Sequence, residues 1–215
     1  SYGDVDGRWR AGMIIQNLGP KIKYDESGRE TFLPTNLRLD TGFDFLLDQY
    51  NKVSVTAEFA KLLVPTPPIL GYEYNFTDNN ENGVYDEDID ELGEQTTGEL
   101  VVYNGQTTDV NFLQGVFQSF SDAPGGFSEE LKEFTWALGA EYVYDDSFAL
   151  RAGYFNESED KGARKFLALG AGFKFSGTRV DLSYLFSASR VPSPLENTLR
   201  FSLTFDFGSN TYLEY

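Results

Sequence analysis

The sequence predicts an all-β fold, in which antiparallel strands run up and down and form a transmembrane β-barrel. Three observations support this prediction. Apolar and polar residues alternate over unusually long segments, short and long connections between these segments alternate along the chain, and aromatic residues gather at one end of the apolar face. Alternation with a period of two is typical of a strand that has one apolar and one polar face.

The segment 36–48 shows the alternation most clearly. Its odd positions are apolar except for Thr41, and its even positions are polar or glycine except for Leu46. An average strand has roughly 5–6 residues, whereas about 9–11 tilted residues cross the apolar layer of an outer membrane. Seven further segments have the same pattern. The eight predicted strands cover residues 8–17, 36–48, 52–63, 133–144, 148–156, 165–175, 180–188 and 199–207.

The connections between these strands are of two kinds. Those near 48–51, 145–147 and 176–179 are tight turns. The others are longer, at about 18–34, 64–131, 157–164 and 189–197. Because the two kinds alternate strictly, all the long connections are expected at one end of the sheet, which is the asymmetry of outer-membrane barrels.

Aromatic residues of the apolar face gather beside the tight turns. Rings concentrate in this way at the boundary between membrane and water, so we expect the apolar face to contact lipid and the polar face to line a lumen. The alternative is a soluble β-sandwich, which has shorter strands and no reason to align its rings. The aromatic residues are Phe43, Phe45, Tyr142, Tyr144, Phe148, Phe173, Phe175, Phe205 and Phe207.

Composition excludes several classes of function. The 215 residues contain no cysteine and no histidine, which removes disulfides, thiolate metal sites and His-dependent catalysis. The net charge of −17 argues against nucleic acid as a partner. No apolar stretch is long enough for a membrane helix, and we expect any export signal to lie outside this sequence.

Charged residues of both signs occupy the predicted lumen face. Paired carboxylates can carry out acid–base chemistry, but the preferred interpretation is that ion pairs hold the strands in register. We therefore expect no enzymatic activity and no required cofactor. The residues are Arg38, Asp40, Asp44, Glu58, Glu141, Arg151, Asp181 and Arg200.

The long connection 64–131 is strongly acidic and contains no lysine or arginine. Within it, DNNENGVYDEDIDE begins like a calcium loop, with oxygen-bearing side chains at alternate positions before and after Gly83. The twelfth position is Ile89, where an EF-hand has a bidentate glutamate, although Asp88 or Asp90 could replace it. A solvated acidic loop is therefore the preferred interpretation, with calcium as the alternative. The candidate calcium ligands are Asp78, Asn80, Asn82 and Asp86.

Several stretches together carry a resemblance to a known family. They are GMIIQNLGPKIKY leading into FLPTNLRL, then VTAEFAKLLVPTPP, and the closing PLENTLRFSLTFDFG. In this order they resemble the PorV (LptO) family, outer-membrane components of the Bacteroidetes type IX secretion system that belong to the wider FadL-like barrels. The resemblance runs from about Gly12 to Gly208. It implies a barrel of about fourteen strands, with residues 1–215 as its C-terminal portion and 64–131 as a long extracellular loop.

The resemblance also implies a non-enzymatic role in protein transport. A family member is expected to dock on the SprA-type translocon, to bind secreted cargo proteins through their C-terminal signal domain, and to shuttle them onward. It would lie among the lipids of the cell outer membrane, with its long loops extracellular and its tight turns periplasmic. The alternative is a FadL-like channel for hydrophobic solutes, which rests on fold analogy alone.

Two features of the long connection suggest where a cargo or partner protein binds. DVNFLQGVFQSF has apolar residues at helical spacing, with Asp109 as a candidate N-cap. Packing over the barrel mouth is the preferred explanation for its apolar face. As an alternative, this helix and the nearby PTPPIL form a docking surface. Its predicted residues are Pro65, Pro67, Pro68, Leu113 and Phe117.

Overall fold

A computed structural model describes residues 6–23, 26, 28–81, 83, 85–189 and 197–206. The predicted all-β antiparallel fold is confirmed. The chain forms two compact units, which we treat separately. The sheet unit comprises Ser1–Gln16, Asn36–Leu62 and Lys132–Tyr215, and the loop unit comprises Asn17–Thr35 and Leu63–Leu131. Neither of the helices in the described ranges has the length and hydropathy of a membrane-spanning helix.

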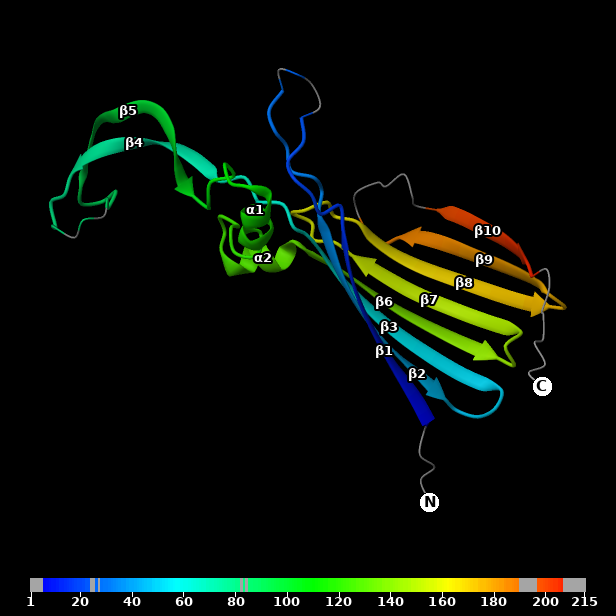
Figure 1. Cartoon of the computed structure of the whole chain (residues 1–215). Helices are drawn as coiled ribbons and strands as arrows, with labels where there is room; N and C mark the ends of the chain where they lie inside the picture. The colour runs from blue at the N-terminus through cyan, green and yellow to red at the C-terminus, as the bar shows by residue number, and fades with distance from the viewer. Residues whose placement is uncertain are drawn as a thin grey trace. The chain divides into compact units, whose positions relative to one another are not determined.

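The sheet unit is one antiparallel sheet of eight strands (Figure 1). Strands that follow one another in the chain lie side by side, apart from the insertion of residues 63–131 between β3 and β6, so the sheet is an up-and-down meander. All eight predicted strands are present, with ends that differ by a few residues. In order across the sheet they are β1 (Asp6–Gln16), β2 (Asn36–Leu46), β3 (Asn51–Leu62), β6 (Phe134–Tyr144), β7 (Phe148–Asn156), β8 (Lys165–Phe175), β9 (Thr178–Ser187) and β10 (Thr198–Phe205).

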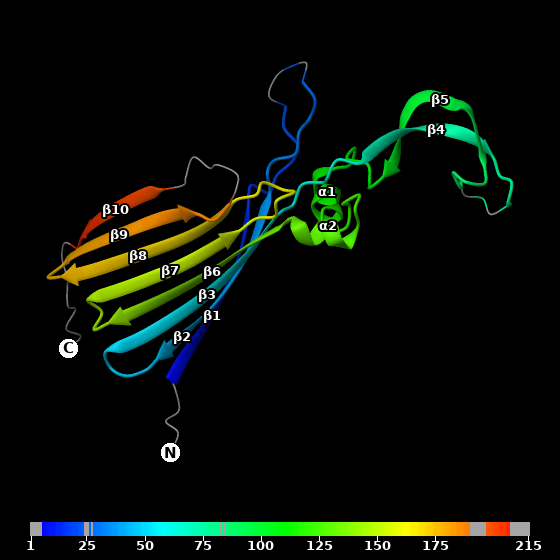
Figure 2. The same cartoon turned by 180° about the vertical axis from the view of Figure 1, so that it is seen from behind.

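The three tight turns lie together at one end of the sheet (Figure 2). Between β6 and β7, Asp145 and Asp146 both have positive φ angles of 49° and 47°, and between β8 and β9 the pair is Ser176 and Gly177. Two left-handed residues in succession give the turn a twist that matches the strands it joins. Between β2 and β3, the Asp48 side chain accepts hydrogen bonds from two backbone N–H groups. These hydrogen bonds lower the pKa of Asp48.

The strand register separates apolar from polar residues across the whole sheet. One row of paired residues crosses all eight strands on the apolar face, and the adjacent row crosses them on the polar face. The apolar row is Trp9, Phe43, Val55, Ala140, Ala152, Leu169, Tyr184 and Leu199. The polar row is Arg8, Asp44, Ser54, Glu141, Arg151, Gly170, Ser183 and Arg200.

The apolar face is not the inside of a water-soluble core. In the described part of the chain, the buried hydrophobic residues are few and mostly small, and none lies on the apolar face of the sheet. Phe173 and Phe205, which do lie on that face, are 53% and 52% exposed. A soluble β-sandwich would cover such side chains with a second sheet, so the structure argues against that alternative.

The sheet is open within the described residues. β1 pairs only with β2, and β10 pairs only with β9, so these two strands form the edges. A closed eight-stranded barrel would require β1 to pair with β10, and the described residues contain no such pairing. The strand order and the separation of the two faces nevertheless fit a β-barrel outer-membrane protein.

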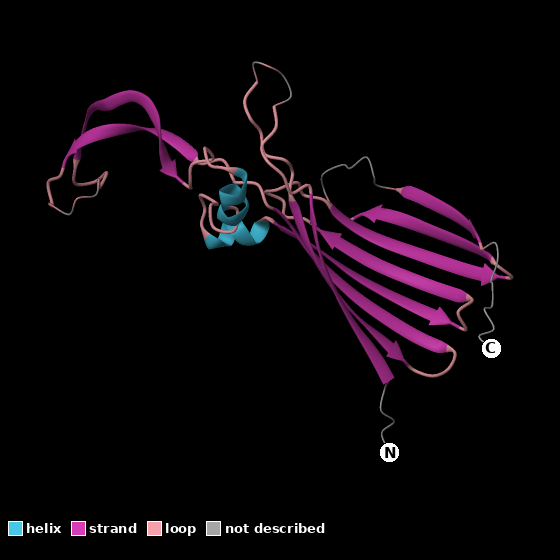
Figure 3. Ribbon diagram, in the orientation of Figure 1, coloured by secondary structure: helices cyan, strands magenta, loops and turns pink. Residues whose placement is uncertain are grey.

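The loop unit contains more regular structure than the sequence predicted. A second, two-stranded sheet is formed by β4 (Ile69–Thr77) and β5 (Glu91–Asn104), and two short helices follow (Figure 3). The predicted helix is present as α1 (Phe112–Gln118), but the proposed N-cap was wrong. Asn111, not Asp109, caps the helix, and its side chain accepts a hydrogen bond of 2.9 Å from the N–H of Gln114. The second helix, α2 (Phe127–Lys132), was not predicted.

Candidate functional surfaces

Aromatic rings follow the tight-turn end of the apolar face, as predicted. Tyr144, Phe148 and Phe173 occupy one row across β6, β7 and β8, and the rings of Phe43 and Phe45 lie 4.6 Å apart on β2. The last member of the predicted set, Phe207, lies outside the described residues. Such a row is typical of the membrane–water boundary of a barrel.

A second aromatic group, which the sequence analysis missed, lies toward the long-loop end of the same face. Phe59 pairs with Trp136 in the register, and the rings of Trp136 and Tyr154 are 5.5 Å apart. From residue 136 to residue 144 of β6, a rise of roughly 3.3 Å per residue and a tilt of about 40° separate the two groups by about 20 Å. This height approaches the ~25 Å apolar band of outer-membrane barrels.

The middle of the apolar face carries no charge. Among the strand residues that the structure describes, only two charged side chains share this face, Lys61 and Lys165, and both lie at the long-loop ends of their strands. Lys61 is only 1% exposed, and its ammonium donates to the carboxylate of Glu133. A buried lysine at the edge of the apolar face is tolerated because its charge is paired with a carboxylate. The apolar face therefore has the composition of a lipid-contacting surface between two boundaries.

The polar face is organised by ion pairs between strands. Asp44 is 2% exposed and accepts hydrogen bonds of 3.0 and 2.8 Å from Arg8 and Arg10 of the neighbouring strand. Arg38 lies 3.9 Å from Glu58. All eight predicted lumen charges share this face. The interpretation of these residues as cross-strand ion pairs therefore fits the structure better than paired catalytic carboxylates.

One ion pair on the polar face passes over an intervening strand. Arg151 of β7 donates to Glu141 of β6 and also to Asp181 of β9, at 2.7 Å. Gly172 of β8 leaves room for the second contact, because a Cβ atom there would lie 2.5 Å from the Asp181 carboxylate and 3.0 Å from the Arg151 guanidinium. The alternation in the sequence predicted that Arg151 and Asp181 share a face. It did not predict that Gly172 leaves room for their contact.

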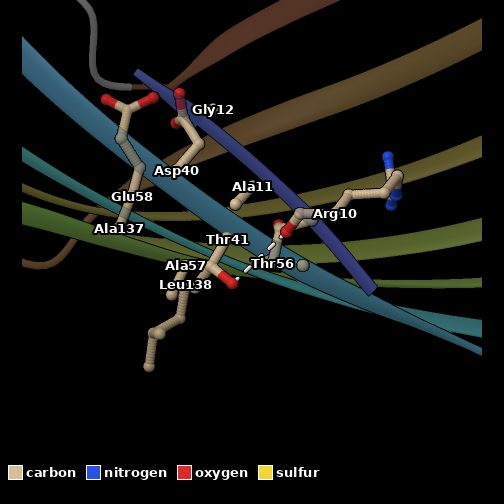
Figure 4. A pocket seen from close by; sticks show the side chains of 12 residues that line it. Arg10, Ala11, Gly12, Asp40, Thr41, Thr56, Ala57, Glu58, Ala137 and Leu138 are labelled. Atoms are coloured by element: carbon tan, nitrogen blue, oxygen red, sulfur yellow. Dashed lines mark hydrogen bonds between the residues drawn. The ribbon is translucent and has the colours of Figure 1, made fainter. Parts of the chain in front are cut away.

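A depression of about 480 Å³ lies among the residues of β1, β2, β3 and β6 (Figure 4). The glycines Gly12, Gly42 and Gly139 line it where no side chain fills the space. Figure 4 shows the carboxylates of Asp40 and Glu58 on the same side of the sheet, opposite to Leu138. Two carboxylates that share one side of a sheet do not by themselves define a catalytic site.

All five predicted docking residues belong to the loop unit, but they differ in exposure. Leu113 and Phe117 of α1 are 51% and 74% exposed, and Pro67 is exposed as well. Pro68 is half-buried and Pro65 is buried. Leu113, Phe117 and Pro67 are therefore accessible to a partner, whereas Pro65 is not.

Two close contacts fix the proline segment against the helical part of the loop unit. A Cβ atom on Gly115 of α1 would lie 3.0 Å from the Pro65 ring, so the glycine allows close packing. The backbone N–H of Thr66 donates to the buried carboxylate of Asp122 at 3.0 Å. Neither Gly115 nor Asp122 was singled out from the sequence, because their roles depend on the fold of the loop unit.

The candidate calcium ligands are engaged in hydrogen bonds within the acidic loop. The Asp78 carboxylate accepts the backbone N–H of Gly83 at 2.7 Å, and the Asn80 side chain donates to Asp86 at 2.7 Å. Asn82 lies outside the described residues. Calcium binding by these residues stays a prediction.

Asp90 organises this loop and was not among the four predicted ligands. It is 7% exposed, and its two carboxylate oxygens accept the backbone N–H groups of Asn79 and Asp86, each at 2.8 Å. A buried carboxylate that accepts two backbone hydrogen bonds stabilises the conformation of the loop.

Ion pairs also order the connection 157–164 in the sheet unit. The Arg164 guanidinium makes two hydrogen bonds of 2.7 and 2.8 Å to Glu157. These hydrogen bonds lower the pKa of Glu157, against the opposing effect of its burial. Lys132, the last residue of α2, donates to Asp160 at 2.7 Å and lowers the pKa of that carboxyl. The connection is thus tied both to itself and to the end of α2.

Comparison with known proteins agrees with the resemblance carried by the strand motifs. The family model described as type IX secretion system protein PorV matches residues 1–69. This span contains β1, β2 and β3 and three of the quoted stretches, including VTAEFAKLLVPTPP. No curated protein matches the chain. The matched family is described by its part in a secretion system and not by an enzymatic activity. Over residues 1–69 the chain is therefore similar to the PorV family of the type IX secretion system.

Proposed function

We propose that this chain is the C-terminal portion of a single larger outer-membrane barrel that binds and shuttles secreted proteins. The observation that carries the proposal is the PorV family match over residues 1–69. The open sheet supports it, because β1 and β10 each present an unpaired edge within the described residues. Exposed edges are a liability in a membrane, where backbone groups have no water to bind. Additional strands would pair with both edges and close the barrel.

The two aromatic groups support a position in the outer membrane. With the apolar face toward lipid, the polar face and its ion pairs line a lumen. By the asymmetry typical of such barrels, the tight turns are periplasmic and the long connections are extracellular. The loop unit, whose two segments follow β1 and β3, is then displayed at the cell surface.

The protein acts in this proposal by binding and not by catalysis. Its partners are the SprA-type translocon, on which it docks, and secreted cargo proteins, which it binds through their C-terminal signal domains. The surface formed by Pro67, Pro68, Leu113 and Phe117, supported by the buried Pro65, is the proposed contact. Exposed apolar side chains such as Leu113 and Phe117 are typical of protein-binding sites.

Replacing the two exposed side chains of α1 tests this contact. The double variant Leu113→Asp and Phe117→Asp should abolish co-purification of cargo with the protein extracted from membranes, because two charges would be buried in an apolar interface. Tyr103→Asp is the matched control, since Tyr103 is 79% exposed but belongs to β5. Unchanged co-purification in the double variant would refute the proposed contact, whereas recovery of lipids or small solutes without protein would favour a solute channel.

A further inference from the structure

The hairpin of β4 and β5 has one apolar face. Leu70, Tyr72 and Phe76 alternate along β4, and the register pairs them with Val102, Leu100 and Leu92 of β5. Tyr74 continues the same face. Apart from Phe76, which contacts the ring of Tyr85, these side chains are 43–55% exposed.

This apolar face is uncovered within the loop unit. Among the described residues, β4 pairs only with β5, and the two strands form a sheet of their own. An isolated two-stranded sheet is at best marginally stable in water. The base of the hairpin is nevertheless held in place, because the side chains of Asn104 and Gln106 donate to the backbone carbonyls of Pro124 and Ser121 at 2.8 and 2.9 Å. The hairpin therefore presents an anchored apolar face.

The negative charge of the hairpin determines which molecules are attracted to this face and which are repelled. From residue 62 to residue 131 the chain contains no lysine or arginine, and ten acidic residues lie between Glu73 and Glu99. Glu73 lies on β4 between Tyr72 and Tyr74, and so on the face opposite to their rings. An anionic lipid surface is repelled by this charge, and so is a second copy of a chain with a net charge of −17. A basic protein segment is attracted.

We propose that the apolar face of the β4–β5 hairpin docks an extended, basic segment of a partner protein. The apolar side chains of that segment cover Leu70, Tyr72 and Leu100, and its lysines or arginines are attracted by the ten acidic residues from Glu73 to Glu99. An extended segment fits because alternation with a period of two places its apolar residues toward the hairpin and its charges away from the apolar contact. Leu70 lies two residues after Pro68, but this surface is formed by β4 and β5, whereas Leu113 and Phe117 belong to α1. The inference therefore adds a second contact to the proposed cargo contact.

Binding of a designed peptide to the complete chain in detergent tests the proposal. The probe is a fluorescent peptide of alternating valine and lysine. Alternating valine and glutamate, and alternating serine and lysine, are its two controls. Fluorescence anisotropy should show binding of the valine–lysine peptide only, and binding should weaken when salt is raised from about 50 to about 500 mM, because salt screens the charges.

Variants locate the binding on the apolar face. Leu70→Ser with Leu100→Ser should weaken binding of the valine–lysine peptide about tenfold or more, through loss of apolar contact. Tyr103→Ser is the matched control. Tyr103 is 79% exposed and lies beside Gly71, on the other face of the hairpin, so its replacement should leave binding unchanged. Circular dichroism of each variant verifies that the strands are retained.

Several outcomes would overturn the inference. They are equal binding of the valine–glutamate or serine–lysine peptide, binding that is insensitive to salt, unchanged binding by the double variant, and binding of the hairpin to anionic vesicles in preference to the peptide. The variant Leu113→Asp with Phe117→Asp should bind the peptide normally. Failure of the cargo contact and failure of the hairpin contact can therefore be told apart.

Discussion

At the scale of single residues, a few small or charged side chains decide how the polar groups of this protein are satisfied. Gly172 leaves the space through which Arg151 reaches Asp181 across an intervening strand. Asp44 joins two arginines of the adjacent strand. The sequence predicted that these charges share a face, because alternation alone settles that. It did not predict their partners, because partners depend on the register between strands, which a pattern within one strand does not contain.

The Glu157–Arg164 pair should make the connection 157–164 sensitive to acid. The pKa of Glu157 is lowered from its ordinary value of 4.5, first by the hydrogen bonds from Arg164. A carboxyl with a lowered pKa stabilises the folded state above its unfolded pKa, and this stability is lost as the pH falls through the folded pKa. Because Arg164 is 54% exposed, the effect should stay below about 1 kcal/mol.

Hydrogen exchange of the amides in this connection measures the effect. The N–H groups of Lys161 and Ala163, which both donate to the Ser158 carbonyl, should lose protection by up to about fivefold below pH 4.5, after correction for intrinsic exchange. Glu157→Gln should remove most of this pH dependence. Glu159→Gln, at a largely exposed carboxylate, should leave most of it in place. Equal pH dependence in the wild type and in Glu157→Gln would contradict the assigned role.

At the scale of elements, sequence patterns predicted the eight strands of the large sheet and missed the hairpin of the loop unit. Each strand of the large sheet has a period of two with few exceptions, such as Thr41 and Leu46. In β4 the same alternation is present, but β5 pairs with it through three irregularities in register. Bulges of this kind break the alternation that marks a strand. The acidic composition of the segment also favoured interpretation as a loop.

The first residue of α1 was also not predicted correctly from the sequence. Both Asp109 and Asn111 are good N-cap residues, and apolar spacing alone does not choose between them. The structure places the cap at Asn111, two residues later than predicted, because its side chain reaches the N–H of Gln114. The exposed residues of the candidate docking surface could be predicted from the sequence, but the burial of Pro65 could not, since it depends on Gly115 lying against it.

Removal of this cap should loosen α1. Asn111→Ala leaves the Gln114 N–H without its side-chain acceptor and should cost about 1 kcal/mol of helix stability. Hydrogen exchange at the N–H groups of Gly115 and Ser119, which bond to carbonyls one turn earlier, should then become several-fold faster. Asp109→Ala is the matched control and should change exchange by less than twofold. If Asp109→Ala accelerated exchange more than Asn111→Ala, Asp109 would be the N-cap, as expected from the sequence.

At the scale of the whole molecule, the two faces of the large sheet are suited to two different environments, lipid and water. One face carries aromatic residues at both ends and aliphatic residues between them, and the other carries cross-strand ion pairs. The sequence predicted one aromatic group because its residues occur in adjacent pairs beside the turns. The second group was missed because Phe59, Trp136 and Tyr154 are single residues in different strands, and only the register brings Phe59 and Trp136 into one row.

Arginine substitutions on opposite faces of one strand test this division. Leu169 lies in the middle of β8 on the apolar face, between Ala152 and Tyr184 in the register, and Ala168 is its neighbour on the polar face. Leu169→Arg should destabilise the protein in lipid vesicles by about 2–4 kcal/mol, because it places a charge near the middle of the bilayer. Ala168→Arg should cost less than about 1 kcal/mol, since the charge faces a polar lumen beside Gly153. Guanidinium unfolding followed by tryptophan fluorescence measures both values. If Ala168→Arg is the more damaging substitution, the polar face is the one that lacks water, and the assignment of the apolar face to lipid fails.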